Sequence, residues 1–108
     1  MNLDVLVFAA HPDDAELSMG GTIAKLTDNG LKVGVVDLSK GELGTRGSAE
    51  IRRQEAESAG QILKLAHREN LGLKDGSLKF NEEYLKKIIS KIRKHQPKII
   101  FAPYFNDR

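Results

Sequence analysis

Short apolar runs that alternate with segments of helical periodicity constrain the fold of this chain more than any other feature. The runs occupy residues 3–9, 32–38, 69–73 and 98–102, and the helical segments between them occupy residues 13–30, 48–66 and 81–96. Apolar runs of this length are typical of strands that are buried on both faces of a sheet. Strands that alternate with helices predict a parallel sheet of the α/β class.

The predicted helices carry signals at their ends and apolar positions along one face. Asp13 and Glu16 have the spacing of a capping box, Gly30 suits a C-terminal cap, and Ser48 and Asn81 suit N-caps. The apolar positions are Leu17, Ile23 and Leu26 in the first helix; Ile51, Ala56, Ala59, Ile62, Leu63 and Ala66 in the second; and Leu85, Ile88, Ile89 and Ile92 in the third. We expect these faces to pack on the sheet.

The order of elements predicts a Rossmann-like, three-layer α/β sandwich with strand order 3-2-1-4. In such a sheet, ligands bind beyond the carboxyl ends of the strands, at the point where the strand order reverses. Residues 11–14, 40–47 and 104–108 follow strand ends and are expected to line one crevice there. The fourth strand is expected to have an exposed edge and an uncovered face, so that the fragment folds marginally or self-associates unless a partner covers it.

The composition restricts the available chemistry. The 108 residues suffice for one domain, and a net charge of +2 does not indicate binding to nucleic acid or an anionic membrane. No cysteine is present, which excludes disulfides and thiolate metal ligands. No segment resembles a signal peptide or a membrane span, so we expect a cytoplasmic protein. The late basic residues are interpreted as a solvated helix face: Lys86, Lys87, Lys91, Arg93, Lys94 and Lys98.

One histidine and two aspartates lie within four residues at the end of the first predicted strand. A metal hydrolase needs nitrogen or oxygen ligands that leave a position for water, and a base to take the proton of that water. His11 and Asp14 could be the ligands and Asp13 the base. Zinc suits this donor set, and nickel, cobalt or iron also fit it. Alternatively, Asp13 or Asp14 caps the first helix, a role that leaves His11 unexplained and is compatible with metal binding.

Glycines interrupt two of the predicted elements. Gly20 and Gly21 lie inside the first helix, where each costs up to ~1 kcal/mol relative to alanine. Close packing of the helix on the sheet is the favoured explanation, and approach of the backbone to a ligand is the alternative. The loop at residues 40–47 has glycine at every third position and matches no nucleotide-binding motif. It is interpreted as a substrate-side loop or an ordinary surface loop.

Four further polar residues have structural interpretations. Arg52 is three residues from Glu55 and could form a surface ion pair, or could bind substrate oxygens from the first turn of its helix. Asp75 is most simply a turn residue. His67 and His95 have no neighbours of ligand type in the sequence and are interpreted as structural or solvated.

Taken together, these motifs resemble those of the LmbE-like, or PIG-L, metal-dependent deacetylases of N-acetylglucosamine conjugates. The matching motifs are Ala10-His-Pro-Asp-Asp-Ala-Glu16, Gly20-Gly-Thr22, Gly41-Glu42, Thr45-x-Gly47, Arg52-x-x-Glu55, Asn70-Leu-x-Leu-x-Asp-Gly76 and Phe101-Ala-Pro103. They occur in order along the whole chain. The branch that the chain is most similar to acts in the bacillithiol pathway on N-acetylglucosaminyl-malate.

The resemblance implies a role for each candidate residue. His11 and Asp14 would bind the metal, normally zinc, and Asp13 would be the general base. Arg52 would contact the substrate and Asp75 would help shape the sugar site. The partner would be a small-molecule N-acetylglucosamine conjugate, without nucleic acid or membrane, and a homo-oligomer, often a hexamer, would be expected.

The sequence departs from the family pattern after the fourth predicted strand. The family continues there into a His-Pro-Asp-His motif that donates a third metal ligand, whereas this chain reads Tyr104-Phe-Asn-Asp-Arg108. Residues 1–108 are therefore expected to be the N-terminal part of a single deacetylase domain, with little activity alone. The alternative is a non-catalytic, receiver-like α/β module that binds Mg²⁺, in which Asp75 would accept a phosphoryl group. That alternative gives no role to His11.

Overall fold

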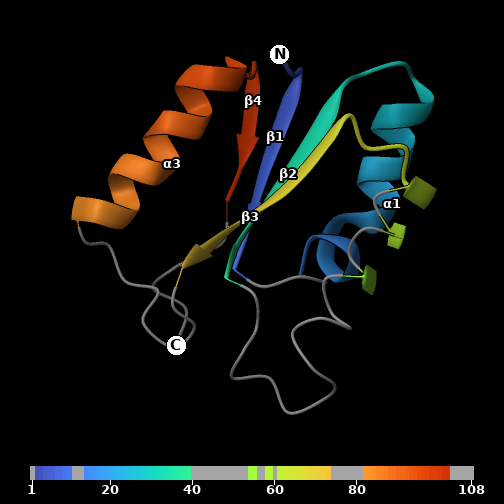
Figure 1. Cartoon of the computed structure of the whole chain (residues 1–108). Coiled ribbons are helices and arrows are strands. Elements are labelled where there is room, and N and C mark those ends of the chain that lie inside the picture. Colours follow the sequence, from blue (N-terminus) through green and yellow to red (C-terminus); the bar gives the residue numbers. More distant parts are fainter. Residues whose placement is uncertain are drawn as a thin grey trace.

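The computed structural model describes residues 2–10, 14–39, 54–55, 58–59, 61–73 and 82–102, with the backbone alone at residues 14 and 16–18. Its elements are β1 (Val5–Ala9), α1 (Asp14–Asp28), β2 (Val33–Ser39), β3 (His67–Leu73), α3 (Glu82–His95) and β4 (Ile99–Phe101) (Figure 1). The four predicted strands and the first and third predicted helices are confirmed, with ends that shift by a few residues. Of the predicted second helix, residues 54–55, 58–59 and 61–62 are described as helical.

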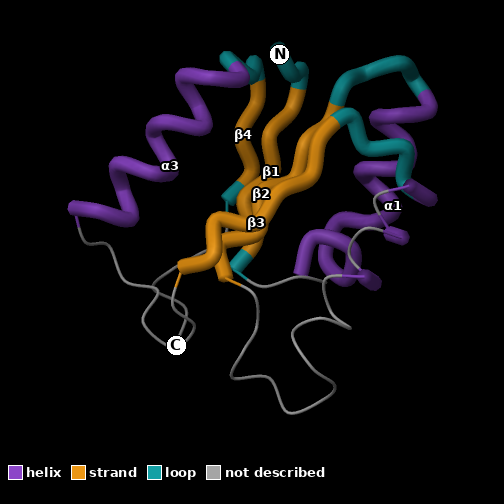
Figure 2. Tube along the Cα trace, viewed as in Figure 1, coloured by secondary structure: helices purple, strands orange, loops and turns teal. Residues whose placement is uncertain are grey.

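The four strands form one parallel sheet in the predicted order, β3-β2-β1-β4. Val5 is paired with Val33 of β2 on one side and with Ile99 of β4 on the other. Figure 2 shows the strands running side by side between α1 and α3, which cover opposite faces. All four strands therefore end at the same edge of the sheet, the lower edge in Figure 1. Neither α1 nor α3 has the length and apolar content that crossing a membrane requires.

The core consists of two apolar layers, one on each face of the sheet. The layer under α1 contains Val5, Val7, Ala9, Ala15, Ile23, Val33 and Val35. The layer under α3 contains Leu3, Leu6, Phe8, Val36, Leu38 and Leu73, with Tyr84, Ile88 and Ile92 packed against it. Successive side chains of a strand point to opposite faces, and β1 and β2 are buried along their whole length. Burial on both faces explains why these strands have continuous apolar sequences.

Two predicted apolar faces differ from the structure. Ile62 is 79% exposed, and Ala66 is also exposed. The chain leaves the helical conformation at Lys64, which has a φ of 59°. It then pairs with β2 through a bond from Ala66 N to Val33 O. On α3, Leu85 and Ile89 are exposed. The row that packs on the sheet is Tyr84, Ile88 and Ile92, at intervals of four residues. The predicted positions Ile88 and Ile92 are therefore confirmed, and Tyr84 was not predicted.

Strand β4 lies at one edge of the sheet. It is paired with β1, and all three of its residues are exposed, from 51% at Ile99 to 38% at Phe101. The predicted exposed edge and uncovered face are therefore confirmed.

The glycine at the end of α1 and the two glycines within the helix differ in whether the backbone or the packing requires a glycine there. Gly30 has a φ of 85°, and Leu31 N donates to Leu26 O at 3.1 Å, which confirms the predicted C-terminal cap. A Cβ atom added at Gly20 or Gly21 would meet no atom within 4 Å in the described part of the chain. Helix–sheet packing therefore does not require these two glycines, and that favoured explanation is wrong. Approach of the backbone to a ligand stays a prediction.

We expect Gly21→Ala and Gly30→Ala to change stability in opposite directions. The first should raise the free energy of unfolding by about 0.5–1 kcal/mol, because alanine is the better helix former and has room there. The second should lower it by about 1 kcal/mol, because alanine is strained at positive φ. Urea unfolding followed by circular dichroism measures both. Destabilisation by Gly21→Ala would contradict the open space around that position.

Candidate functional site

The residues predicted to perform the chemistry lie at the boundary of what the structure describes. His11, Asp13, Arg52 and Asp75 lie outside the described residues, and Asp14 is described only by its backbone, as the first residue of α1. Their roles therefore stay predictions. The structure does describe the strand ends and the helix start that flank residues 11–13.

A chain of hydrogen bonds joins the ends of three strands at this edge. The carbonyl oxygen of Ala10 accepts bonds from Ser39 N at 3.0 Å and from Ser39 Oγ at 3.1 Å. The carbonyl oxygen of Ser39 in turn accepts a bond from Asn70 Nδ2 at 2.6 Å, and Asn70 Oδ1 accepts one from Gly72 N at 2.7 Å. Residues 11–13 therefore leave the sheet from a backbone position that is held by the buried Ser39 side chain.

Helix α1 begins directly after this point, so residues 11–13 connect the end of β1 to the positive end of a helix. The free N–H groups of a first helical turn favour nearby carboxylates. This connection lies where the strand order reverses between β1 and β4, which is where α/β sheets bind ligands. The strand order that places this connection at the switch point is thus confirmed, whereas the site itself stays a prediction.

Close to this edge, an internal charge pair occupies the α1 side of the sheet. Arg68 of β3 donates from Nε to Asp37 Oδ2 at 3.1 Å and from Nη2 to Asp37 Oδ1 at 3.1 Å. The side chains are only 11% and 3% exposed, so the two-pronged contact neutralises a buried carboxylate. Sequence reasoning missed this pair.

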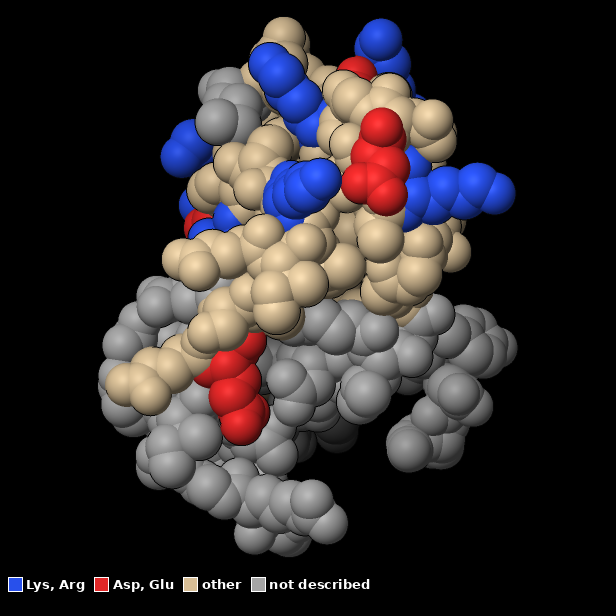
Figure 3. Space-filling view, turned by 90° about the vertical axis from the view of Figure 1, so that its right-hand side faces the viewer, with Lys and Arg blue, Asp and Glu red and all other residues tan. Residues whose placement is uncertain are grey.

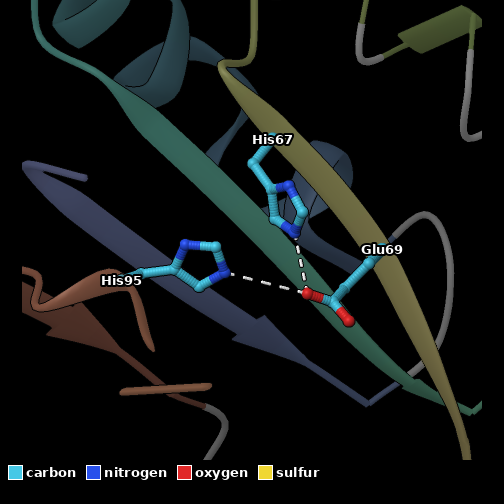
Figure 4. A group of neighbouring side chains, drawn as sticks. All are labelled: His67, Glu69 and His95. Atoms are coloured by element: carbon cyan, nitrogen blue, oxygen red, sulfur yellow. Dashed lines mark hydrogen bonds and ion pairs between the residues drawn. The ribbon is translucent and has the colours of Figure 1, made fainter. Parts of the chain in front are cut away.

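A second group of ligand-type side chains lies at the other end of the sheet. Glu69 Oε1 is 2.7 Å from His67 Nε2 and 3.8 Å from His95 Nε2 (Figure 4). The three residues offer ligand atoms within 4.8 Å of one another, so the group could hold a metal ion. The interpretation of both histidines as residues without ligand-type neighbours is therefore wrong. The only sequence signal was the spacing of His67 and Glu69, which places both on one face of a strand.

Glu69 also contacts the basic face of α3. Its Oε2 atom is 2.9 Å from Lys91 Nζ. Burial alone would raise the pKa of Glu69, but hydrogen bonds with His67 and Lys91 and the charge of Lys91 hold it below the usual value of 4.5. The carboxylate is therefore ionised at neutral pH. Lys91 is thus half-buried and paired. The other members of the predicted solvated face are exposed, as expected: Lys86, Lys87, Arg93, Lys94 and Lys98.

On the α1 side, the part of the surface that the structure describes shows no single concentration of basic side chains. Figure 3 shows Lys and Arg side chains spread among uncharged residues, with acidic ones between them. One such neighbouring pair is Lys64 and Asp28, whose charged atoms are 3.7 Å apart at 72% and 67% exposure. This described surface gives no support to a nucleic-acid interface.

The doubly wound sheet and the position of the motif at residues 11–14 define a class of α/β protein, and comparison with known proteins identifies the family. The model of the family described as PIG-L, GlcNAc-PI de-N-acetylase, matches residues 6–108. The chain belongs to this family. The resemblance seen in the sequence is thereby confirmed, whereas similarity to the bacillithiol branch in particular stays a prediction.

Three relatives define the similarity further. Diacetylchitobiose deacetylase of Thermococcus kodakarensis is 35% identical in an alignment of 106 positions that covers 92% of this chain and 40% of that protein. The crystal structure of the conserved protein TT1542 from Thermus thermophilus has a TM-score of 0.91 and 44% identity, over 98% of this chain and 48% of the other. GalB, the 4-carboxy-2-hydroxymuconate hydratase of Pseudomonas putida, has a TM-score of 0.80 and 28% identity, over 93% and 46%. The chain thus spans about half the length of the relatives that it matches, or less.

We expect Arg68→Ala to lower the free energy of unfolding by about 3 kcal/mol, because it removes the guanidinium that neutralises the buried Asp37 carboxylate. Lys64→Ala is the matched control, since it breaks an exposed pair and should change stability by less than about 1 kcal/mol. Chemical denaturation of both variants and the wild type gives the comparison. Equal effects of the two substitutions would show that the internal pair does not stabilise the sheet.

Proposed function

We propose that this chain carries the N-terminal part of the active site of a zinc-dependent N-deacetylase that acts on an N-acetylglucosamine conjugate. The observation that carries the proposal is that, in a chain of the PIG-L family, the sequence places His11 and Asp13 between the anchored end of β1 and α1, whose first residue is Asp14. The family membership leaves the receiver-like alternative without support. A homo-oligomer in the cytoplasm is part of the same proposal, and light scattering of the purified protein tests the assembly.

The described surroundings and the donor types suit a divalent metal. A strand end that is held by Ser39 and a helix start provide fixed attachment points for imidazole and carboxylate ligands, and a helix start favours anionic groups. His11 and Asp14 would hold the metal. A bound zinc ion polarises the acetyl carbonyl group and lowers the pKa of water.

Asp13 would handle the protons of the reaction. As water attacks the acetyl carbonyl carbon, the Asp13 carboxylate accepts a proton from it and then donates this proton to the leaving nitrogen. The C–N bond breaks, and the products are acetate and a free amine. Arg52 would contact the substrate and Asp75 would help to shape the sugar site, both as the family resemblance implies.

The choice of substrate is the finer part of the proposal. The relative from Thermococcus is named for diacetylchitobiose, a disaccharide of N-acetylglucosamine, whereas the motifs resemble those of enzymes that act on N-acetylglucosaminyl-malate. Both carry the same acetamido sugar and differ in the group attached to it. We propose N-acetylglucosaminyl-malate, and a parallel assay of acetate release from both compounds decides between them.

The similarity to GalB favours one rival function, the addition of water to an unsaturated carboxylic acid. Both reactions need an activated water, so the motif at residues 11–14 does not distinguish them. Hydration of 4-carboxy-2-hydroxymuconate without acetate release from either acetamido sugar would replace the deacetylase proposal with this one.

We expect substitutions in the motif to separate metal ligands from the base. His11→Ala and Asp14→Ala should each abolish binding of one zinc equivalent, because each removes a ligand. Asp13→Asn should retain that zinc and lower the rate of acetate release at least about 100-fold, because the amide cannot accept the proton. Isothermal titration with zinc and an acetate assay of the metal-loaded chain measure the two effects.

Asp28→Asn is the control for these variants, since it alters an exposed carboxylate at the far end of α1. It should change neither zinc binding nor the rate of acetate release.

Because the chain spans only part of its relatives, acetate release by these 108 residues is expected to be slow. Rapid turnover by Asp13→Asn, or unchanged zinc binding by both ligand variants, would contradict the assigned roles.

A further inference from the structure

The group formed by His67, Glu69 and His95 comes from two elements that pack directly on each other. His67 and Glu69 are two residues apart on β3 and point to the face covered by α3, as Leu71 and Leu73 do. His95 is the last residue of α3 and is buried, with 1% of its side chain exposed. A rigid strand and the end of a packed helix therefore bring the three side chains together, far along the sequence from one another.

The distances in this group are close to those of a metal site. In a tetrahedral zinc site with bonds of about 2.0–2.1 Å, neighbouring ligand atoms are about 3.4 Å apart. The distances from Glu69 Oε1 to the two Nε2 atoms, 2.7 Å and 3.8 Å, lie on either side of this value. Figure 4 shows both Nε2 atoms directed at the same carboxylate oxygen. The two imidazole rings are tilted by 45° with centroids 4.6 Å apart, and the three ligand atoms lie within 4.8 Å of one another.

We propose that His67, Glu69 and His95 form a second divalent-metal site, suited to zinc. Two imidazoles and one carboxylate are a ligand set that zinc accepts, with water in the fourth position. His67 begins β3, so the group lies at the amino ends of the strands, whereas residues 11–14 follow the carboxyl end of β1. The site is therefore distinct from the one in the proposed function.

Lys91 prepares Glu69 for this role. Its Nζ atom contacts Oε2, which leaves Oε1 directed at the histidines, and such outer contacts orient metal-binding carboxylates. A groove of about 470 Å³, lined by Glu69 and Lys91 together with Lys87 and Ser90, gives water access to the carboxylate.

A metal at this site would join the start of β3 to the end of α3. It would bind the folded chain and not the unfolded one, so it would raise the free energy of unfolding by an amount that grows with the logarithm of the metal concentration once that exceeds the Kd. The site is expected to contribute to structure, because its ligands lie at the end of the sheet opposite to the candidate active site.

The test uses the full chain with His11→Ala and Asp14→Ala combined, which removes the other predicted site. We expect this double variant to bind one equivalent of zinc. Its melting temperature should rise when zinc is added, and titration with Co²⁺ should give the visible absorption of tetrahedral cobalt. Adding Glu69→Gln should weaken zinc binding at least about tenfold, and His67→Gln should do the same. The matched control is Glu82→Gln, which alters an exposed carboxylate on α3 and should leave binding unchanged.

Both test substitutions affect partly exposed side chains, so a folded protein is expected, and circular dichroism verifies it. His95→Ala is avoided because that side chain is buried. Absence of zinc binding in the double variant would overturn the inference. Equal affinities of the Glu69→Gln and Glu82→Gln variants for zinc would also overturn it. In either case the group would be a hydrogen-bonded ion-pair network only. Failure of the proposed function has a different signature, namely zinc binding by the wild type that His11→Ala and Asp14→Ala do not reduce.

Discussion

The pairing of β1 with β2, buried on both faces, is the constraint on which the rest of the structure depends. Every residue from Val33 to Ser39 is buried, and so is every residue of β1. Neither strand can face water, so a helix must cover each side, and α1 and α3 pack on the two apolar layers. Because parallel strands need crossover connections, these same helices set all strand ends at one edge. The edge where the candidate active site lies is thus a consequence of how the core is buried.

Hydrogen bonds extend this order to Ala10, the residue before the predicted motif at residues 11–14. Ser39 is the last residue of β2, and its backbone and hydroxyl both bind Ala10, the residue before His11. A side chain that is completely buried thereby holds the first residue outside β1. Sites on rigid supports need less ordering when they bind a ligand, so these bonds would help to position a site that follows Ala10.

Strand order and element type were predictable from the sequence because they follow from local patterns. The apolar runs at β1 and β2 are continuous, and the order β3-β2-β1-β4 follows from general rules for such sheets. The face that α3 presents was predictable only in part. Ile88 and Ile92 were expected, but Tyr84 and Leu85 start competing apolar rows and only the shape of the sheet selects between them. The contact of His95 with Glu69 depends on that choice, which is why sequence reasoning missed it. The roles of His11, Asp13 and Asp14 rest on the motif and the family, since those side chains are not described.

The two ends of the sheet differ in the elements that carry the candidate ligands, so they suit different kinds of metal site. At the carboxyl ends, the candidate ligands belong to a connection between a strand and a helix, where the first turn has free N–H groups and loops can approach a substrate. At the amino ends, the ligands of the second proposed site come from within β3 and from the last turn of α3, with His95 enclosed by packed side chains. A ligand that is buried in this way leaves little space for a substrate around the metal. The same sheet can therefore hold a reactive metal at one end and a stabilising metal at the other.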